Sequence, residues 1–190
     1  MCEKYLANGK DVFGAFMDLE RAYDTIDRLG IWQMLRVFGV GGKLLKPVQS
    51  FHVDSRACVR VGNDVSVWFP VNVGLRQGCV MSSWLFNVYM DGVVREVYVR
   101  VIGKGLELLS AKDGRFEINQ LLFADDTALV ADTEEKVCRL VSEFGRVCER
   151  RMLKVNVGKN KVMRCSRYGN GDRMHVILNG EPLKEVDYFK

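Results

Sequence analysis

Two adjacent carboxylates interrupt an apolar stretch near residue 125. The sequence LLFADDTALVA at 121–131 places Asp125 and Asp126 between two short apolar runs. Each run has the length of a β-strand, so the pattern predicts an antiparallel hairpin whose two-residue turn is Asp125–Asp126. Carboxylates beside a buried sheet usually have a partner, often a metal ion. Aspartate is also a common turn residue, and a solvated turn is therefore the alternative.

Another carboxylate, Asp18, follows a second apolar run. Residues 12–17 are apolar at every position, which is typical of a central strand that is covered on both faces. If this strand neighbours the hairpin, Asp18 and the Asp125–Asp126 turn converge, and together they can hold two divalent ions about 3.5 to 4 Å apart. Mg²⁺ prefers a few protein oxygens combined with substrate phosphates. The three acids therefore predict a site for two-metal phosphoryl chemistry.

Four segments in order resemble the palm motifs of reverse transcriptases from non-LTR, LINE-type retrotransposons. They are FMDLERAYD at 16–24, GLRQGCVMSSWLFN at 74–87, LLFADD at 121–126 and NVGKNKVM at 156–163. The resemblance extends from about Asp11 to the end, where VDYFK at 186–190 resembles the start of the primer-grip hairpin. It implies RNA-directed DNA synthesis, in which two Mg²⁺ ions, or Mn²⁺, assist transfer of a dNTP to the 3′-hydroxyl of a DNA primer on an RNA template.

The resemblance also implies roles for individual residues of the first and third motifs. Asp18 and Asp125 would be the main metal ligands, and Asp126 would be a third acid. The backbone carbonyl of Leu19 would complete the shell of the second ion. Tyr23 would lie under the sugar of the nucleotide and exclude a ribose 2′-hydroxyl; the alternative is an aromatic ring that only packs at a helix start.

The remaining two motifs contribute polar and basic residues. Arg76, Gln77 and Gly78 belong to a Gly-rich turn before a helix, where glycine permits close backbone approach and Gln77 can donate and accept hydrogen bonds near nucleotide or template. An ordinary loop leading into a helix is the alternative. Lys159 falls where the family carries a lysine proposed to protonate pyrophosphate, although it also suits an exposed surface position.

The chain departs from the family pattern at a few positions. Ser83 stands where the family usually has proline, and Asn160 stands where it usually has serine or threonine. The residues before Asp11 do not resemble the start of the fingers, and no thumb motif follows. We therefore expect a single, partial reverse transcriptase palm domain over residues 1–190.

Composition narrows the class of protein. The chain has 190 residues, 48% hydrophobic and 27% charged, which is typical of one globular domain with a hydrophobic core. No apolar run reaches membrane-spanning length and the N-terminus lacks a signal-peptide core, so we expect an intracellular protein, in the nucleus or the cytoplasm, without a membrane partner. The six cysteines form no CxxC pair and the two histidines are isolated, which argues against zinc and against a disulfide framework. The oligomeric state is left open.

Basic residues are concentrated in one stretch. Residues 146–173 contain nine of the 28 Lys and Arg residues but two of the 24 acids. A local basic surface of this kind suits binding to a phosphate backbone, next to the acidic site. A solvated charged helix face is the alternative.

The pattern of apolar residues predicts an α+β fold. Asp27 is a candidate N-cap for a helix that carries Ile31, Met34, Leu35 and Phe38 on one stripe and ends near Gly39. Further helices are expected over 44–51, over 83–99 and after Thr133, with Cys138 and Cys148 in the core. Strands are expected at 56–61, 65–71, 154–157 and 161–165, with a terminal pair at 174–178 and 185–189 and a turn at 169–171. Together these predict a ferredoxin-like polymerase palm, an antiparallel sheet with helices on one face.

Three functional hypotheses follow from the sequence. The first is an RNA-directed DNA polymerase. The second is an inactive truncated remnant that acts at most as a nucleic-acid-binding module and binds RNA or DNA in a salt-dependent way. The third is a metal-dependent phosphohydrolase or nuclease, because paired carboxylates suit that chemistry too.

Overall fold

The computed structural model describes residues 2–101, 106–110, 114–123, 126–167 and 173–187. Contacts divide the chain into two units: Met1–Glu20 together with Val93–Lys190, and Arg21–Gly92. The expectation of one palm domain over the whole chain stays a prediction.

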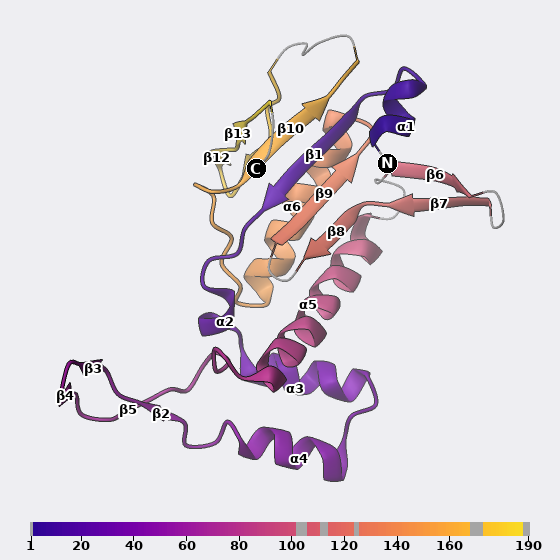
Figure 1. Cartoon of the computed structure of the whole chain (residues 1–190). Coiled ribbons are helices and arrows are strands. Elements are labelled where there is room, and N and C mark those ends of the chain that lie inside the picture. The colour runs from indigo at the N-terminus through magenta and orange to yellow at the C-terminus, as the bar shows by residue number, and fades with distance from the viewer. Residues whose placement is uncertain (1, 102–105, 111–113, 124–125, 168–172, 188–190) are drawn as a thin grey trace. The chain divides into compact units, whose positions relative to one another are not determined.

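The first unit is built on a five-stranded sheet (Figure 1). In spatial order the strands are β13 (Lys184–Glu185), β10 (Lys161–Cys165), β1 (Val12–Met17), β9 (Asp126–Ala131) and β8 (Gln120–Phe123). β1 is central and antiparallel to both neighbours, whereas the short β13 pairs with β10 in parallel. The apolar run that precedes Asp18 is therefore the central strand that the sequence predicts.

One face of this sheet packs against α6 (Glu134–Arg150). Ala15, Met17 and Leu129 alternate onto this face and are buried. α6 begins as predicted, because the side chain of Thr133 accepts a hydrogen bond from the backbone N–H of Lys136. Its apolar stripe is fully buried, and the core of the first unit lies between α6 and the sheet.

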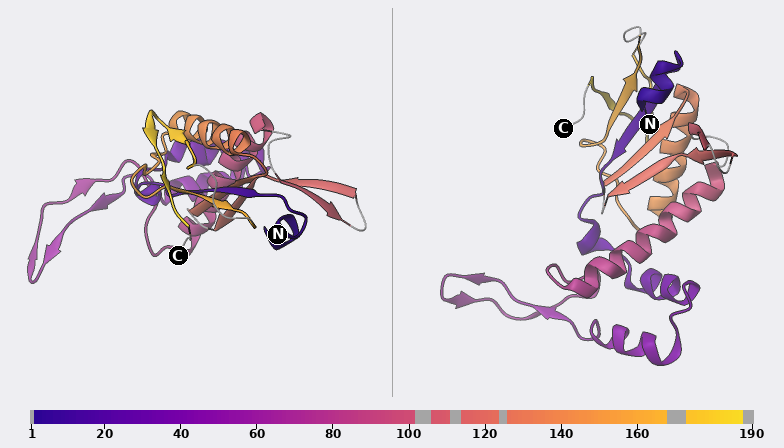
Figure 2. Two further views of the ribbon diagram at one scale, coloured as in Figure 1. Left: turned by 90° about the horizontal axis from the view of Figure 1, so that it is seen from above. Right: turned by 45° about the vertical axis from the view of Figure 1, so that its right-hand side comes forward.

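The opposite face of the sheet carries a shorter helix, α1 (Cys2–Ala7). Tyr5 of α1 packs on Val12 and Val130 at one end of that face. Figure 2 shows α1 and α6 on opposite sides of the sheet. Phe16 and Ala128, farther along the same face as Val12 and Val130, are only half-buried.

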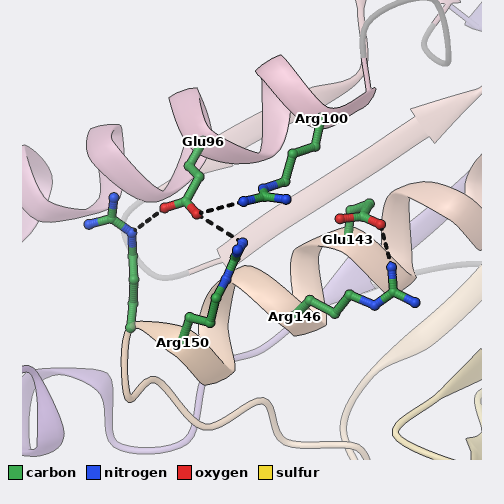
Figure 3. A network of polar contacts seen from close by, with 6 residues as sticks. Glu96, Arg100, Glu143, Arg146 and Arg150 are labelled. Atoms are coloured by element: carbon green, nitrogen blue, oxygen red, sulfur yellow. Dashed lines mark hydrogen bonds and ion pairs between the residues drawn. The ribbon is translucent and has the colours of Figure 1, made fainter.

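Residues 93–101 of α5 (Val80–Val101) belong to the first unit and are joined to α6 by ion pairs. Glu96 lies 3.5 Å from Arg100, 2.8 Å from Arg150 and 2.9 Å from Arg151, measured between carboxylate oxygen and guanidinium nitrogen (Figure 3). Burial acts to raise the pKa of Glu96, but the Arg151 hydrogen bond and the three positive charges outweigh it and lower that pKa. The carboxylate is therefore ionised and holds the two helices together.

Short hairpins complete the first unit. β6 (Leu106–Ser110) pairs with β7 (Gly114–Ile118), and β11 (Ile177–Leu178) pairs with β12 (Glu181–Pro182).

None of the described helices combines the length and apolar character needed to cross a membrane.

The second unit contains helices and one irregular hairpin. The helices are α2 (Ala22–Thr25), α3 (Arg28–Val37), α4 (Gly42–Ser50) and the N-terminal part of α5. The hairpin consists of β2 (Arg56–Ala57) paired with β5 (Phe69–Pro70) and β3 (Arg60–Val61) paired with β4 (Asp64–Val65). Asp27 caps α3 as predicted, by accepting hydrogen bonds from the N–H groups of Leu29 and Gly30. In α5 the predicted stripe of Phe86, Met90, Val93 and Val97 is buried.

Several predicted elements are wrong. Phe38 is 45% exposed, because α3 ends at Val37 and the helical stripe stops before Phe38. Residues 154–157 form no strand beyond an isolated bridge between Leu19 and Val155. The predicted terminal pair does not form among residues 173–187, because β11 folds back on β12 and β13 joins the main sheet instead; residues 188–189 of that pair lie outside the described residues. The turn predicted at 169–171 lies outside the described residues.

Candidate active site

Asp18 and Asp126 lie at the ends of neighbouring strands. β1 and β9 are antiparallel, and their register ends with Met17 opposite Thr127. The next residues along this register are Asp18 and Asp126. Both border a cavity of about 480 Å³, which is also lined by Phe16, Leu122, Gly158, Lys159 and Lys161. The strands that carry the first and third motifs are therefore adjacent, as the sequence analysis required.

The predicted turn is wrong at Asp126. Asp126 is the first residue of β9 and pairs with Phe123, so it belongs to the strand and not to the turn. Polarity suggested an Asp125–Asp126 turn, but the pairing of two strands, which polarity alone does not reveal, decides where a strand begins. Asp125 itself lies outside the described residues.

The backbone of Asp18 is held by the segment 154–160. Its N–H donates to the side-chain oxygen Oδ1 of Asn160 at 2.7 Å, and its carbonyl accepts from the N–H of Asn156 at 2.9 Å. The N–H of Glu20 donates to the carbonyl of Lys154 at 2.7 Å. In this pairing the carbonyl of Asp18 accepts a hydrogen bond. Within the described backbone, no hydrogen bond of this pairing uses the carbonyl of Leu19. Asp18 is therefore fixed from both of its peptide bonds.

Sequence reasoning missed the role of Asn160. It noted Asn160 only as a departure from serine or threonine, whereas the side chain is 1% exposed and anchors Asp18. The one hint in the sequence was the position of Asn160, directly after Lys159 in the fourth motif. An anchor across 142 residues of chain leaves no local pattern that could reveal it.

Lys159 approaches the carboxylate of Asp18. Its Nζ lies 3.4 Å from Oδ2 of Asp18, and its side chain is 68% exposed. That Oδ2 atom is buried and has no hydrogen-bond donor among the described residues. A buried carboxylate oxygen without a donor is unfavourable unless a cation lies close to it. The ammonium of Lys159 is such a cation, and a carboxylate oxygen in this setting is also a suitable metal ligand.

The described residues supply part of a metal site. Among them, no group of three or more acidic, histidine or cysteine side chains could hold a metal ion. Asp125, the third predicted carboxylate, is outside that part of the chain. Asp18 and Asp126 offer hard oxygen ligands at one cavity, which fits Mg²⁺ because this ion keeps waters and substrate phosphates among its ligands.

The other predicted site residues lie in the second unit. The ring of Tyr23 stacks on Phe86, with centroids 4.3 Å apart and planes 12° apart. Tyr23 as a whole is half-buried. Arg76, Gln77 and Gly78 are exposed in the loop that leads to α5, and Nε2 of Gln77 donates to Asp24 at 2.8 Å. The structure thus joins the first and second motifs within this unit.

The basic stretch at 146–173 does not form one patch. Arg150 and Arg151 contact Glu96, and Arg164 donates two hydrogen bonds to Asp11, which lower the pKa of that carboxyl. Of the basic residues in the described part of this stretch, Lys159 and Lys161 line the cavity. The predicted basic surface beside the acids is therefore correct for these two lysines and wrong for Arg150, Arg151 and Arg164, because ion pairs hold these three arginines elsewhere.

Comparisons with known proteins find related sequences and related folds. The family model described as "Reverse transcriptase (RNA-dependent DNA polymerase)" matches residues 2–188. A Pol polyprotein of the type-1 retrotransposable element R2 from Nasonia vitripennis is 28% identical over 126 residues, which are 66% of this chain and 12% of that protein. The polyprotein of element R2DM from Drosophila melanogaster is 28% identical over 63% of this chain and 10% of its own length. The chain thus spans about a tenth of these relatives.

Solved structures share the fold. Apo telomerase from Candida tropicalis aligns with a TM-score of 0.65 and 12% identity, over 92% of this chain and 35% of that chain. Telomerase from Candida albicans, in complex with a fragment of telomeric RNA, aligns with a TM-score of 0.64 and 13% identity, over 89% of this chain and 29% of that chain. This likeness confirms the predicted α+β fold of a polymerase palm.

Proposed function

Because the chain belongs to the reverse transcriptase family, in the branch of non-LTR retrotransposons, we propose that it carries the polymerase active site of such an element. The reaction is transfer of a nucleotide from a dNTP to the 3′-hydroxyl of a DNA primer on an RNA template. One observation carries this proposal: Asp18 and Asp126 come from adjacent strands and border one cavity. Residues 1–190 would be part of a single palm domain of the longer protein.

Asp18, Asp125 and Asp126 would hold two Mg²⁺ ions, with Mn²⁺ as a substitute and the carbonyl of Leu19 as a further ligand. When bound, such ions lower the pKa of the attacking hydroxyl and neutralise charge on the triphosphate. The protein contributes the rigid placement of its carboxylates. Asn156 and Asn160 support that placement, because they hold the peptide groups on either side of the Asp18 side chain.

Lys159 would donate a proton to the departing pyrophosphate. Its exposed side chain reaches the carboxylate of Asp18, which supports a position beside the metal-bound phosphates. In the second unit, Tyr23 would exclude the 2′-hydroxyl of a ribonucleotide. Arg76, Gln77 and Gly78 would contact the nucleotide or the template, and their exposure in the loop before α5 supports this role.

Primer extension tests the proposal. The substrates are an RNA template, a DNA primer and dNTPs with Mg²⁺ or Mn²⁺, and the variants are Asp18→Asn and Asp126→Asn. We expect each variant to lose at least ~100-fold in rate, because metal ions supply several kcal/mol of transition-state stabilisation. Asp64→Asn, in the exposed strand β4, is the matched control and is expected to extend the primer normally. Extension that survives both active-site changes would reject the mechanism.

A second candidate function is nucleic-acid binding without catalysis. Lys159 and Lys161 at the cavity favour it, because they suit a phosphate backbone whether or not chemistry follows. Salt-dependent RNA binding without nucleotide incorporation, in this chain and in the full-length parent protein, would support this candidate. Hydrolysis of nucleic acid in the absence of dNTPs would instead indicate a metal-dependent nuclease.

A further inference from the structure

The loop 73–78 of the second unit is docked onto the segment that carries Tyr23. The N–H of Leu75 donates to the carbonyl of Tyr23 at 2.7 Å, and the N–H of Gly74 donates to the carbonyl of Ile26 at 3.1 Å. Gly74 has φ +78°, and a Cβ at this position would lie 2.5 Å from the carbonyl oxygen of Asp24. Glycine is therefore required for the two backbones to approach this closely.

Arg28 holds the same loop from the other side. Its Nε donates to the carbonyl of Gly74 at 2.8 Å, its Nη2 to that of Val73 at 3.3 Å and its Nη1 to that of His52 at 2.9 Å. One guanidinium thus connects the start of α3, the end of α4 and the loop. The planar fork of arginine can serve three carbonyls at once, whereas a lysine ammonium cannot reproduce this geometry.

Side chains join the loop to α2 as well. Nε2 of Gln77 donates to Oδ1 of Asp24 at 2.8 Å. Tyr23, the neighbour of Asp24, is then held at its carbonyl by Leu75 and at its ring by Phe86. The place of the Tyr23 ring therefore depends on the place of the loop.

From these contacts we propose that Arg28 and Asp24 are positioning residues that set the selection of deoxyribonucleotides over ribonucleotides. Arg28 fixes the loop, the loop fixes the backbone of Tyr23, and Asp24 fixes Gln77 on the same segment. The proposal rests on the proposed function, in which Tyr23 excludes the 2′-hydroxyl. A small shift of that ring admits the extra oxygen, because steric exclusion depends on sub-ångström placement.

The first test replaces Arg28 by lysine and measures kcat/KM for one dNTP and for the matching rNTP. We expect Arg28→Lys to lower the dNTP-to-rNTP ratio ~10-fold, the size expected when a charge-assisted hydrogen bond is lost. Arg36→Lys, an exposed arginine in the last turn of the same helix, is the control and should keep the ratio. A purely structural role would lower both efficiencies equally and leave the ratio unchanged.

Hydrogen exchange provides a readout that does not depend on catalysis. In Arg28→Lys the amides of Gly74 and Leu75 should exchange faster, while that of Leu35 in the C-terminal half of α3 should keep its rate. This pattern distinguishes release of the loop from unfolding of the whole unit. Unchanged exchange at both loop amides would overturn the inference.

The second test exchanges the partners of the Asp24–Gln77 bond. Gln77→Glu alone places two carboxylates together and should lower the ratio ~3-fold or more, a modest effect because the pair is exposed. Adding Asp24→Asn restores a donor and an acceptor in reversed order and should recover the ratio. Because both proteins carry the same change at position 77, recovery isolates the pair itself.

The outcomes separate the two proposals. If the wild-type protein, tested within its parent sequence, incorporates no dNTP, this result overturns both the proposed function and this inference. If the wild-type protein incorporates dNTPs but the Arg28→Lys variant keeps the wild-type dNTP-to-rNTP ratio, this inference alone is overturned.

Discussion

Asp18 is positioned mainly through its backbone. The Asn160 side chain and the Asn156 amide bind the two peptide groups of Asp18, and the carboxylate itself remains available at the cavity. A carboxylate held in this way keeps its orientation without using its own oxygens. The same residue would lose that orientation if the buried N–H had no acceptor.

The first prediction at the residue scale concerns Asn160. Asn160→Leu keeps the volume of the side chain but removes the acceptor of the Asp18 N–H. We expect a loss of about 1–3 kcal/mol in the free energy of unfolding, because a half-buried donor is left unsatisfied beside an apolar side chain. Urea denaturation measures it, with Asn72→Leu in an exposed loop as the control, which should change stability by less than about 0.5 kcal/mol. Equal effects of the two changes would contradict the anchoring role.

Two glycines of the second unit lie where neighbouring elements come very close together. In α5, Gly92 lies against Met34 of α3, where a Cβ would come within 2.5 Å of the methionine side chain. In the loop before α5, Gly74 contacts the backbone of α2. The two contacts differ, because a methionine side chain can move aside and a backbone carbonyl cannot.

The prediction at the element scale compares two glycines that both have positive φ. Gly74→Ala should destabilise the protein more than Gly62→Ala, although each introduces a side chain into a left-handed conformation. The strain alone costs about 1–3 kcal/mol, and Gly62 has open space around it, whereas Gly74 adds a clash with the carbonyl of Asp24. Thermal melting of both variants measures the difference. Equal melting temperatures would indicate that the loop does not dock closely.

Across the described residues, the cysteine thiols differ in burial and therefore in expected reactivity. Among the described residues, the cysteines at 58, 79, 138 and 148 carry free thiols. Burial raises the pKa of the Cys148 thiol to about 12 and raises that of Cys138. The backbone N–H groups of Ser82 and Met81 at the start of α5 lower the pKa of the Cys79 thiol.

The prediction at this scale is a ranking of thiol labelling. A lowered pKa gives more thiolate below the ordinary value of 9.0, and a raised pKa gives less, so at pH 7 Cys79 should be alkylated before Cys138 and Cys148. Peptide mapping by mass spectrometry after a short exposure to iodoacetamide measures the order. Cys79→Ser should remove this early modification. Rapid labelling of Cys148 in the native protein would contradict its burial.

The sequence alone determined the family, the α+β class and most helices. These depend on local information: the apolar period of α6, the caps at Asp27 and Thr133, and motifs whose residues are consecutive. It predicted a central strand before Asp18, because a fully apolar strand is covered on both faces, but it left the adjacency of this strand to the hairpin as a condition that the structure then met for β1 and β9.

Only the tertiary structure decided which distant segments meet. It placed Asn160 on Asp18, Arg28 on the loop before α5, and Glu96 among the arginines of α5 and α6. It also assigned Asp126 to a strand, because register follows from the pairing of two segments and not from the polarity of one. Contacts between residues far apart in sequence leave no periodic signal, so they emerge only once the chain is folded.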